Sequence, residues 1–482
     1  MRLLADRACV RGQEVSTDLI KRALKMAEDI LQQIFEYVDQ HFDDHLAATQ
    51  RYLRQPSIST ENLGIQECAE MTAEMLRDLG ADAGLVPLKG GHPVVYGHLM
   101  SRNSDRTLLV YGMYDVQPVD PLAAWDSPPF EARIVDGRII ARGAINTKGP
   151  LMAFIHAVHS IQAVTGDVPV NLIFLIDGEE ELGSRHLPQF IEQYTDELKK
   201  ADAMYYHLPL ETVKGHPQVS LGFKGIAYFE LTVKTLLTDA HSMVGPVVNS
   251  PVWRLIWALN SMRGADDRIV IDGFYENVRP PTEEDERLLT DLVDIWGPRA
   301  FKEMYGITEF REGLDGLDLV REAIFAPGLN IDGFLSGYTG PGPKAIVPAS
   351  AMCKIDIRLV PDMTVQEILD KVRAHLDRHG YGDIELRFVT GYDPARTSPK
   401  EHIAQAAVRA LRRLDAEPGV VPILPGTAPQ VLFSEPPLNM PFVMSGLGHG
   451  WLLHAPNEYF EVEGLRACEK SAVALLYEFA DA

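Results

Sequence analysis

The first half of the chain alternates between short apolar runs and longer stretches with helical spacing. Apolar residues recur every three or four positions in 17–48 and in 61–79, which predicts two amphipathic helices. Nearly continuous apolar runs at 107–113 and 170–176 predict buried strands. A helix is expected between them from Pro150 onward, because proline is tolerated in the first turn of a helix. Helices alternating with apolar strands indicate a mostly parallel sheet covered by helices.

The pattern changes near residue 222. Residues 225–235 alternate between apolar and polar positions, which is typical of an antiparallel strand with one exposed face. The following segments predict two strands around a turn, an amphipathic helix ended by Gly380, a further strand, and then helix, strand and helix: 344–361, 364–380, 384–392, 401–414, 441–447 and 465–479. We therefore expect an α/β protein with a mostly parallel, helix-covered sheet, interrupted by an α+β domain. The expected limits are 1–221 and 391–482 for the main domain and 222–390 for the insertion.

Composition narrows the class of protein. The 482 residues, 46% of them hydrophobic, are enough for two domains with their own cores. The net charge of −23, without a basic block, argues against binding to nucleic acid or to an anionic membrane. No apolar run approaches the ~18 residues of a membrane span, and the apolar stretch in the first 13 residues is too short for a signal peptide. Four scattered cysteines without a CxxC pair fit a reducing cytoplasm, so we expect a cytoplasmic protein.

Polar segments whose residues could act in catalysis or ligand binding follow several of the expected strands. These segments are Met113 to Asp115, Asp177 to Glu181 and His449 to His454, and a further segment, 142–150, precedes a helix. In open α/β sheets, ligands bind beyond the carboxyl ends of the strands. A pair of glutamates after a strand is usually a solvated loop, and a single histidine is usually structural. Their joint occurrence at strand ends favours a functional site.

Five blocks in this sequence resemble a known family. The blocks are DGEEELGS, RGAINTKGP, TDAHSMVG, LHAPNEYF and GYTGPGPKAIVPASAMCKIDIRLVP. From about residue 45 onward the chain is similar to the di-zinc peptidase family of carnosine and cytosolic dipeptidases, aminoacylases and carboxypeptidase G. The resemblance implies a catalytic domain split by a lid domain through which two copies form a homodimer. It also implies a small amide or peptide substrate that bears a carboxylate.

The resemblance implies two zinc ions bridged by an aspartate and a water, and this chain departs from that arrangement. Met113 stands at a histidine ligand, and Asn146 stands at the bridging aspartate. Glu181 and His454 match the remaining ligands. A further carboxylate would fall near residues 207–208, where the chain has histidine and leucine.

The changed positions weaken the expected metal centre. A thioether is a soft, neutral ligand, and an amide oxygen carries no charge to offset a zinc ion. We therefore expect at most one divalent metal ion per chain, with zinc as the first candidate, or none. His207 or His449 could replace a missing ligand, although the spacing alone does not establish this.

The resemblance also assigns roles outside the metal positions. It implies that Glu180 is the general base, that Asp115 orients a neighbouring group, and that His241 stabilises the oxyanion in the partner subunit's site. The residues expected to contact the substrate carboxylate, or to lie in the matching lid loop, are Arg358, Thr427 and Thr339. Two of these assignments have simpler alternatives, since Arg358 could pair with Asp356 and His241 could cap a helix. Ile423 replaces an arginine of the dipeptidases, which leaves the substrate class open.

Three functions remain open at this point. The favoured one is an enzyme that cleaves or rearranges a small amide with one metal ion or none, using Glu180 as the base. The second is an inactive homologue that binds a ligand or a partner. The third is a metal-free enzyme of another reaction type, such as amide formation or isomerisation, in which His449 and Trp451 serve a different substrate.

Overall fold

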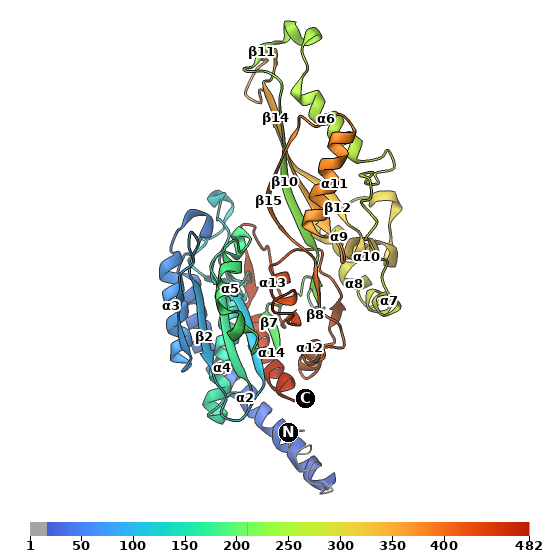
Figure 1. The fold of residues 1–482 in the computed structure, drawn as a ribbon. Coiled ribbons are helices and arrows are strands. Elements are labelled where there is room, and N and C mark those ends of the chain that lie inside the picture. Colours follow the sequence, from blue (N-terminus) through green and yellow to red (C-terminus); the bar gives the residue numbers. More distant parts are fainter. Residues whose placement is uncertain (1–16, 210, 482) are drawn as a thin grey trace.

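The computed structural model describes residues 17–209 and 211–481. The first 16 residues, on which the expectation about a signal peptide rests, lie outside the described residues. The chain forms a main domain around one large sheet and a lid domain that projects from it (Figure 1).

The main domain contains an eight-stranded sheet with the order β1-β2-β6-β3-β7-β18-β8-β17. These strands are β1 (Asp82–Val86), β2 (Val94–Leu99), β6 (Asn171–Asp177), β3 (Thr107–Met113), β7 (Ala203–His207), β18 (Phe442–Ser445), β8 (Gln218–Ser220) and β17 (Gly419–Val421). The four central strands, β6, β3, β7 and β18, run parallel to one another. Antiparallel pairs are confined to the flanks, so the predicted mostly parallel α/β sheet is confirmed.

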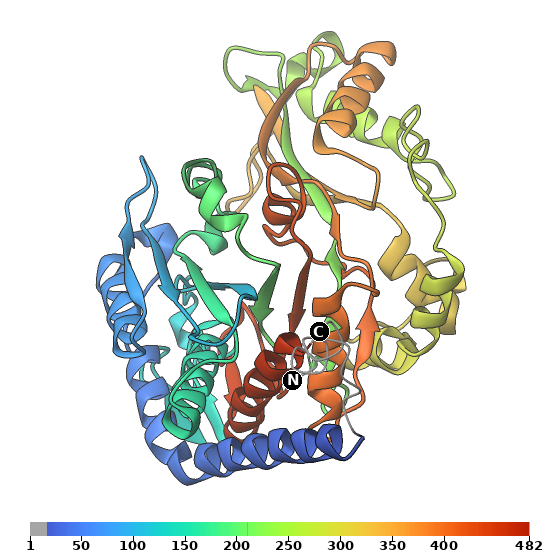
Figure 2. The same cartoon turned by 60° about the horizontal axis from the view of Figure 1, so that its bottom comes forward.

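Helices cover both faces of this sheet. One face carries α2 (Thr17–Leu53), α3 (Ile65–Asp78), α4 (Lys148–Thr165), α12 (His402–Arg412) and α14 (Val462–Ala480), and Figure 2 shows α14 beside α4 with α2 running beneath them. The other face carries α5 (Leu187–Leu198) and the short α13 (Val431–Ser434). Along β3, Val110 faces the first layer and Tyr111 the second, and both are fully buried. Burial on both faces explains why the sequence shows an almost unbroken apolar run here.

The lid is a four-stranded antiparallel sheet with the order β12-β14-β10-β15. Its strands are β12 (Gly328–Ser336), β14 (Ser350–Leu359), β10 (Gly225–Lys234) and β15 (Glu385–Tyr392). Two helices, α6 (Pro251–Met262) and α11 (Val365–Arg378), cover one face and form a separate core with it. Every second residue of β10 is buried, which matches the predicted period of two. The tip of the lid carries β11 (Ala240–His241), the 3-10 helix η4 (Ser242–Val247) and β13 (Ile346–Val347) (Figure 1).

A helical segment within residues 283–325 was not predicted. It contains α7 (Glu283–Thr290), α8 (Val293–Trp296), α9 (Pro298–Tyr305) and α10 (Gly316–Phe325). Leu289 and Ile324 belong to the core of the main sheet, and Asp285 forms an ion pair with Arg396. The domain limits at 222 and 390 stay a prediction, and these helices pack with the main sheet although they lie between those limits.

Smaller elements complete the main domain. A second, four-stranded sheet consists of β19 (Gly450–Trp451), β20 (Tyr459–Glu461), β5 (Arg138–Ile140) and β4 (Arg133–Val135). The chain passes between the main domain and the lid at two places. The strands β9 (Gly222–Phe223) and β16 (Ala395–Arg396), one from each place, pair with each other. Across the described ranges, no helix is long and apolar enough to cross a membrane.

Candidate active site

The ends of β3 and β6 place two candidate segments side by side. Met113, the last residue of β3, pairs in register with Asp177, the last residue of β6. The backbone N–H of Tyr114 then donates to the carbonyl of Asp177 at 2.9 Å. The loops that leave the two strands therefore start from one point on the carboxyl edge of the sheet, as the sequence predicted.

Asp115 holds the glutamate loop in place. Its side chain is fully buried, and its two carboxylate oxygens accept the backbone N–H groups of Glu180 and Glu181, each at 3.1 Å. Burial, followed by the nearby Asp177 and Glu181, raises the pKa of Asp115 well above its usual range. Asp115 therefore orients the backbone of the paired glutamates.

Glu181, Asn146 and His454 form a triangle of polar side chains. The Nδ2 of Asn146 donates to Glu181 Oε1 at 2.7 Å and lies 3.0 Å from His454 Nε2. Glu181 Oε2 lies 3.4 Å from His454 Nε2 and accepts a 2.6 Å hydrogen bond from Gln117 Nε2. The hydrogen bond with Glu181 raises the pKa of His454, although burial opposes it. The arrangement favours a positively charged imidazole beside a carboxylate.

Glu458 shapes the loop that carries Asn146. Its buried carboxylate accepts the backbone N–H groups of Gly143, Ile145 and Asn146 at 2.9–3.1 Å. It also accepts a 2.7 Å hydrogen bond from Nη1 of Arg142, whose side chain is buried as well. The sequence analysis missed Glu458, whose only signal was its place four residues after His454 in LHAPNEYF.

Glu180 is the one glutamate of the loop whose carboxylate remains free. Within the described ranges no group donates a hydrogen bond to its side chain. Burial is the first cause that raises its pKa well above the usual range, followed by the charges of Glu181, Asp115 and Asp177. A carboxylate without a fixed partner, in such surroundings, has the chemistry of a general base.

Arg358 and Thr427 come together from the lid and the main domain. Arg358, on β14, donates from Nη1 to Thr427 Oγ1 at 3.1 Å and from Nε to Asp356 Oδ1 at 2.9 Å. Thr427 in turn donates to the carbonyl of Lys224 at 2.8 Å. The pairing with Asp356 that we considered from the sequence is present, and a side chain that is 33% exposed still leaves part of the guanidinium open. Ile423, the other residue noted in this region, is fully buried.

His241 and Thr339 lie at the tip of the lid, far from the glutamate loop of the same chain (Figure 1). The Nδ1 of His241 accepts the backbone N–H of Met243 at 3.1 Å, so this histidine caps η4. Thr339 is exposed in the loop after β12. One chain alone therefore does not bring either residue to Glu180.

Comparison with known proteins places the chain among peptidases. Residues 109–478 match the model of the family described as Peptidase family M20/M25/M40. The chain belongs to this family. Beta-Ala-His dipeptidase of Homo sapiens is 29% identical over 420 residues, which cover 81% of each chain. Cys-Gly metallodipeptidase dug1 of Schizosaccharomyces pombe is 27% identical and covers 72% of this chain and 76% of its own.

Two solved structures extend the comparison to the fold. The M20 family metallo-carboxypeptidase Sso-CP2 from Sulfolobus solfataricus superimposes with a TM-score of 0.84 at 34% identity, over 91% of this chain and 99% of its own. Human carnosine dipeptidase 1 gives a TM-score of 0.77 at 27% identity, over 94% and 100%. The α/β main domain with an α+β insertion is thus the fold of this M20 member.

The donor set at this centre does not fit a pair of zinc ions. Met113 offers a thioether, Leu208 offers no ligand, and the Asn146 Nδ2 group points its hydrogens at Glu181. In the described part of the chain, no group of three or more histidines, cysteines or acidic residues could hold a metal ion. Two zinc ions need more anionic and imidazole ligands than these positions supply.

Neither histidine named as a replacement ligand faces Glu181. His207 is buried, with its ring nitrogens 2.8 Å from Tyr205 Oη and 3.0 Å from Cys468 Sγ, and burial lowers its pKa to about 3. His449 lies 2.7 Å from the carbonyl of Glu211 and 3.1 Å from Tyr459 Oη. Both histidines therefore make structural contacts.

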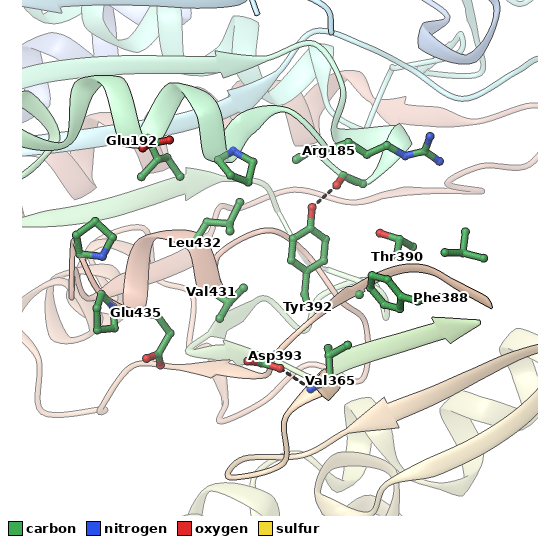
Figure 3. A pocket seen from close by; sticks show the side chains of 18 of the residues that line it. Arg185, Glu192, Val365, Phe388, Thr390, Tyr392, Asp393, Val431, Leu432 and Glu435 are labelled. Carbon is green, nitrogen blue, oxygen red and sulfur yellow. Dashed lines mark hydrogen bonds between the residues drawn. The ribbon is translucent and has the colours of Figure 1, made fainter. Parts of the chain in front are cut away.

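Two cavities flank the centre. One, of about 690 Å³, lies between α5, α13 and β15 of the lid (Figure 3). On its wall the Tyr392 hydroxyl donates to the carbonyl of Gly183, which links the lid to the residue after the glutamate helix η3 (Glu180–Leu182). The other, of about 400 Å³, is lined by Trp451, Leu453 and Tyr305. Trp451 thus contributes an aromatic wall close to His454.

Proposed function

We propose that this chain hydrolyses the amide bond of a small dipeptide or N-acyl amino acid with a free carboxylate. The observation that carries the proposal is the free carboxylate of Glu180 beside the Glu181–Asn146–His454 triangle. We further propose that the centre holds one divalent metal ion at most, or none, because Asn146 and Met113 stand at two ligand positions.

The residues of the centre supply distinct chemical functions. Glu180 takes the proton of the attacking water, which is the role expected of a carboxylate without a fixed partner. The imidazole of His454 is the donor available to a developing oxyanion, because Nδ2 of Asn146 already donates to Glu181. Asp115 keeps the base in position through the backbone bonds to Glu180 and Glu181.

The carboxylate of the substrate binds to Arg358. A guanidinium donates charge-assisted hydrogen bonds to a carboxylate, which are stronger than those between neutral groups. Nε and Nη1 of Arg358 donate to Asp356 and Thr427, which holds the side chain in one rotamer and leaves Nη2 for the substrate carboxylate. Three relatives support a substrate of this size, since they are named as dipeptidases and as a carboxypeptidase.

We also propose that two copies associate through the lid. The outer face of α6 exposes Trp253 and Trp257, which are 57% and 56% exposed and stack at 6.0 Å. A second copy would cover this apolar surface and bring His241 and Thr339 at the lid tip near the site of its partner.

A cytoplasmic location is consistent with the cysteines. In the part of the chain that the structure describes, Cys68, Cys353 and Cys468 are buried and unpaired. Buried thiols far apart in the fold do not indicate an oxidising compartment.

A second function has its own support. Asn146 donates to Glu181 and lies 3.0 Å from His454 Nε2, so protein groups alone fill this part of the centre, as expected of a centre that has lost catalysis and only binds its ligand. This alternative retains the carboxylate contact with Arg358 and predicts binding without turnover.

A turnover screen with a metal analysis separates these functions. Protein purified without chelators is analysed for metal by elemental mass spectrometry and tested on dipeptides and N-acyl amino acids. We expect at most one ion per chain, and turnover that falls ~10²-fold or more in Glu180→Gln. Glu74→Gln, on the exposed surface of α3, is the matched control.

Each possible failure has a separate meaning. Two tightly bound ions per chain would contradict the proposed centre. Full turnover in Glu180→Gln would remove the base from the mechanism. Saturable binding of these compounds without turnover would establish the second function.

A further inference from the structure

A cavity of about 370 Å³ lies next to Arg358. Its walls come from α9, α10, the loop between them, and the start of β12, with Arg358 and Pro425 on one side. The volume lies within the range of sites that hold small ligands. The unpredicted helical segment therefore forms the wall of a space that borders the proposed carboxylate site.

Most charged groups around this cavity already have partners. The ammonium group of Lys224 donates to the carbonyls of Ala323 and Ala326 at the end of α10, at 2.9 and 2.5 Å. Arg311 pairs with Glu322 at 3.1 Å. Within the described ranges Arg358 Nη2 donates to no acceptor, so this nitrogen is left for a ligand.

The rest of the wall is apolar. Phe301, Ile307, Phe310 and Leu314 are half-buried, so each presents apolar surface to the cavity, and Leu319 closes its floor. The rings of Phe301 and Phe310 meet edge to face with their centroids 6.4 Å apart. Such a wall gains free energy when an apolar side chain displaces water from it.

Helix α9 connects this cavity to the reaction centre. Phe301 lines the cavity at Arg358, while Met304 and Tyr305 line the 400 Å³ cavity that includes Leu453, the neighbour of His454. Residues 301 and 304 are separated by roughly 4.5 Å along a helix axis. Helix α9 therefore contributes side chains to the walls of both cavities.

We propose that the cavity at Arg358 receives the side chain of the substrate residue that carries the carboxylate. The chain then selects peptides and N-acyl amino acids whose carboxyl-terminal residue is large and apolar, with Phe301 and Phe310 as specificity-determining residues. The inference rests on the proposed function, because Arg358 must hold the carboxylate for the side chain to enter the cavity.

A binding series tests the selection. The dissociation constants of N-acetyl-L-phenylalanine, N-acetyl-L-aspartate and N-acetylglycine are measured by isothermal titration calorimetry on the Glu180→Gln variant, so that no ligand is consumed. We expect the phenylalanine compound to bind 10- to 100-fold more tightly than the glycine compound, because burial of a large apolar side chain increases affinity by about this factor. N-acetyl-L-phenylalaninamide, which lacks the carboxylate, tests the contact with Arg358.

Three further substitutions separate the contribution of the apolar cavity from that of the carboxylate contact with Arg358. Phe310→Ala should remove most of the preference for phenylalanine over glycine and leave the affinity for N-acetylglycine unchanged. Arg358→Met should weaken the binding of all three acids and leave the binding of the amide unaffected. Phe334→Ala is the matched control, because this phenylalanine is 43% exposed on β12 and does not line the cavity.

The outcomes separate this inference from the function on which it rests. Equal affinity for the phenylalanine and glycine compounds, with both weakened by Arg358→Met, overturns the selection and leaves the carboxylate contact intact. A preference that persists in Phe310→Ala and is lost in Phe334→Ala also overturns it. Binding that is unaffected by Arg358→Met overturns the carboxylate contact, and with it the inference.

Discussion

The side-chain amide of Asn146 donates a 2.7 Å hydrogen bond to Glu181 at the centre of the candidate active site. The same nitrogen lies 3.0 Å from His454, so one neutral residue connects an acid and a base that would otherwise be separate ligands. A second amide, from Gln117, satisfies the other oxygen of Glu181. Each oxygen of this carboxylate thus accepts a hydrogen bond from a neutral amide of the protein.

Asn146→Asp should make the centre depend on a cation. The substitution removes the donated hydrogen bond and puts a second carboxylate against Glu181, so we expect the free energy of unfolding to fall by about 1–3 kcal/mol in the presence of a chelator. A divalent ion that binds between the two carboxylates should restore the loss. Thermal unfolding with EDTA and with added zinc measures both effects.

The lid surface offers a matched control for this substitution. Asn277 donates to Glu367 at 2.9 Å in an exposed position, so Asn277→Asp creates a similar pair of acids in water. We expect little change in stability there and no response to zinc, because exposed charges are well screened. Equal zinc responses in the two variants would contradict a latent cation site at Asn146.

Glu458→Gln should strongly destabilise the main domain. The substitution removes the charge that pairs with buried Arg142. It also replaces one of the two oxygens that together accept four hydrogen bonds with an NH2 group, which cannot accept them. Loss of one partner of a buried ion pair costs about 3–5 kcal/mol. The midpoint of urea unfolding should fall accordingly.

Glu461→Gln is the control, because its 2.7 Å pair with the exposed Lys214 lies near the surface and should contribute about 1 kcal/mol or less. Similar losses in the two variants would contradict the structural role of Glu458.

The pattern of apolar residues was sufficient to predict most of the fold. Runs such as 107–113 and 170–176 are buried on both faces, and the alternation in β10 reflects a strand with one covered face. The helices α7 to α10 were missed because each has only 4 to 10 residues and their packing depends on contacts with the distant main sheet. One local signal was present, since Thr282 and Asp285 form a capping box at the start of α7.

The sequence predicted which loops meet at the candidate site better than it predicted the contacts of single side chains. Positions at strand ends correctly brought Asp115, Glu180 and Glu181 together, because parallel strands end at one edge of a sheet. The partner of Asn146 in its loop, Glu458, lies 312 residues away in the chain, and no local pattern reveals such a contact. Likewise, the spacing left His207 available as a ligand, whereas its strand turns it toward Tyr205 and Cys468.

We predict that substitutions in the exposed apolar surface of α6 prevent dimerisation. Replacing Trp253 and Trp257 together with arginine should convert a dimer into a monomer, because charged groups would have to be buried in the apolar contact. Light scattering after gel filtration measures the change in mass. Leu122→Arg, at an exposed apolar position of the main domain, is the control. A wild-type monomer, or a dimer that persists in the double variant, would contradict association through α6.

Buried histidines should make the protein sensitive to acid. His156 on α4 stacks on His45 of α2 at 4.3 Å, and burial, with the nearby His45 and His159, lowers its pKa from 6.5 to about 3. Between these two values the unfolded chain binds a proton that the folded chain does not, so the free energy of unfolding rises with pH across this window and falls on acidification. For His156 alone, the loss from pH 7 to pH 5 is about 2 kcal/mol.

In His156→Phe, which keeps a stacked ring, the free energy of unfolding in urea should differ between pH 7 and pH 5 by that much less than in the unchanged protein. His216→Phe, at an exposed position, controls for the loss of a histidine. An unchanged pH difference in His156→Phe would mean that the ring accepts a proton in the folded protein as readily as in the unfolded chain.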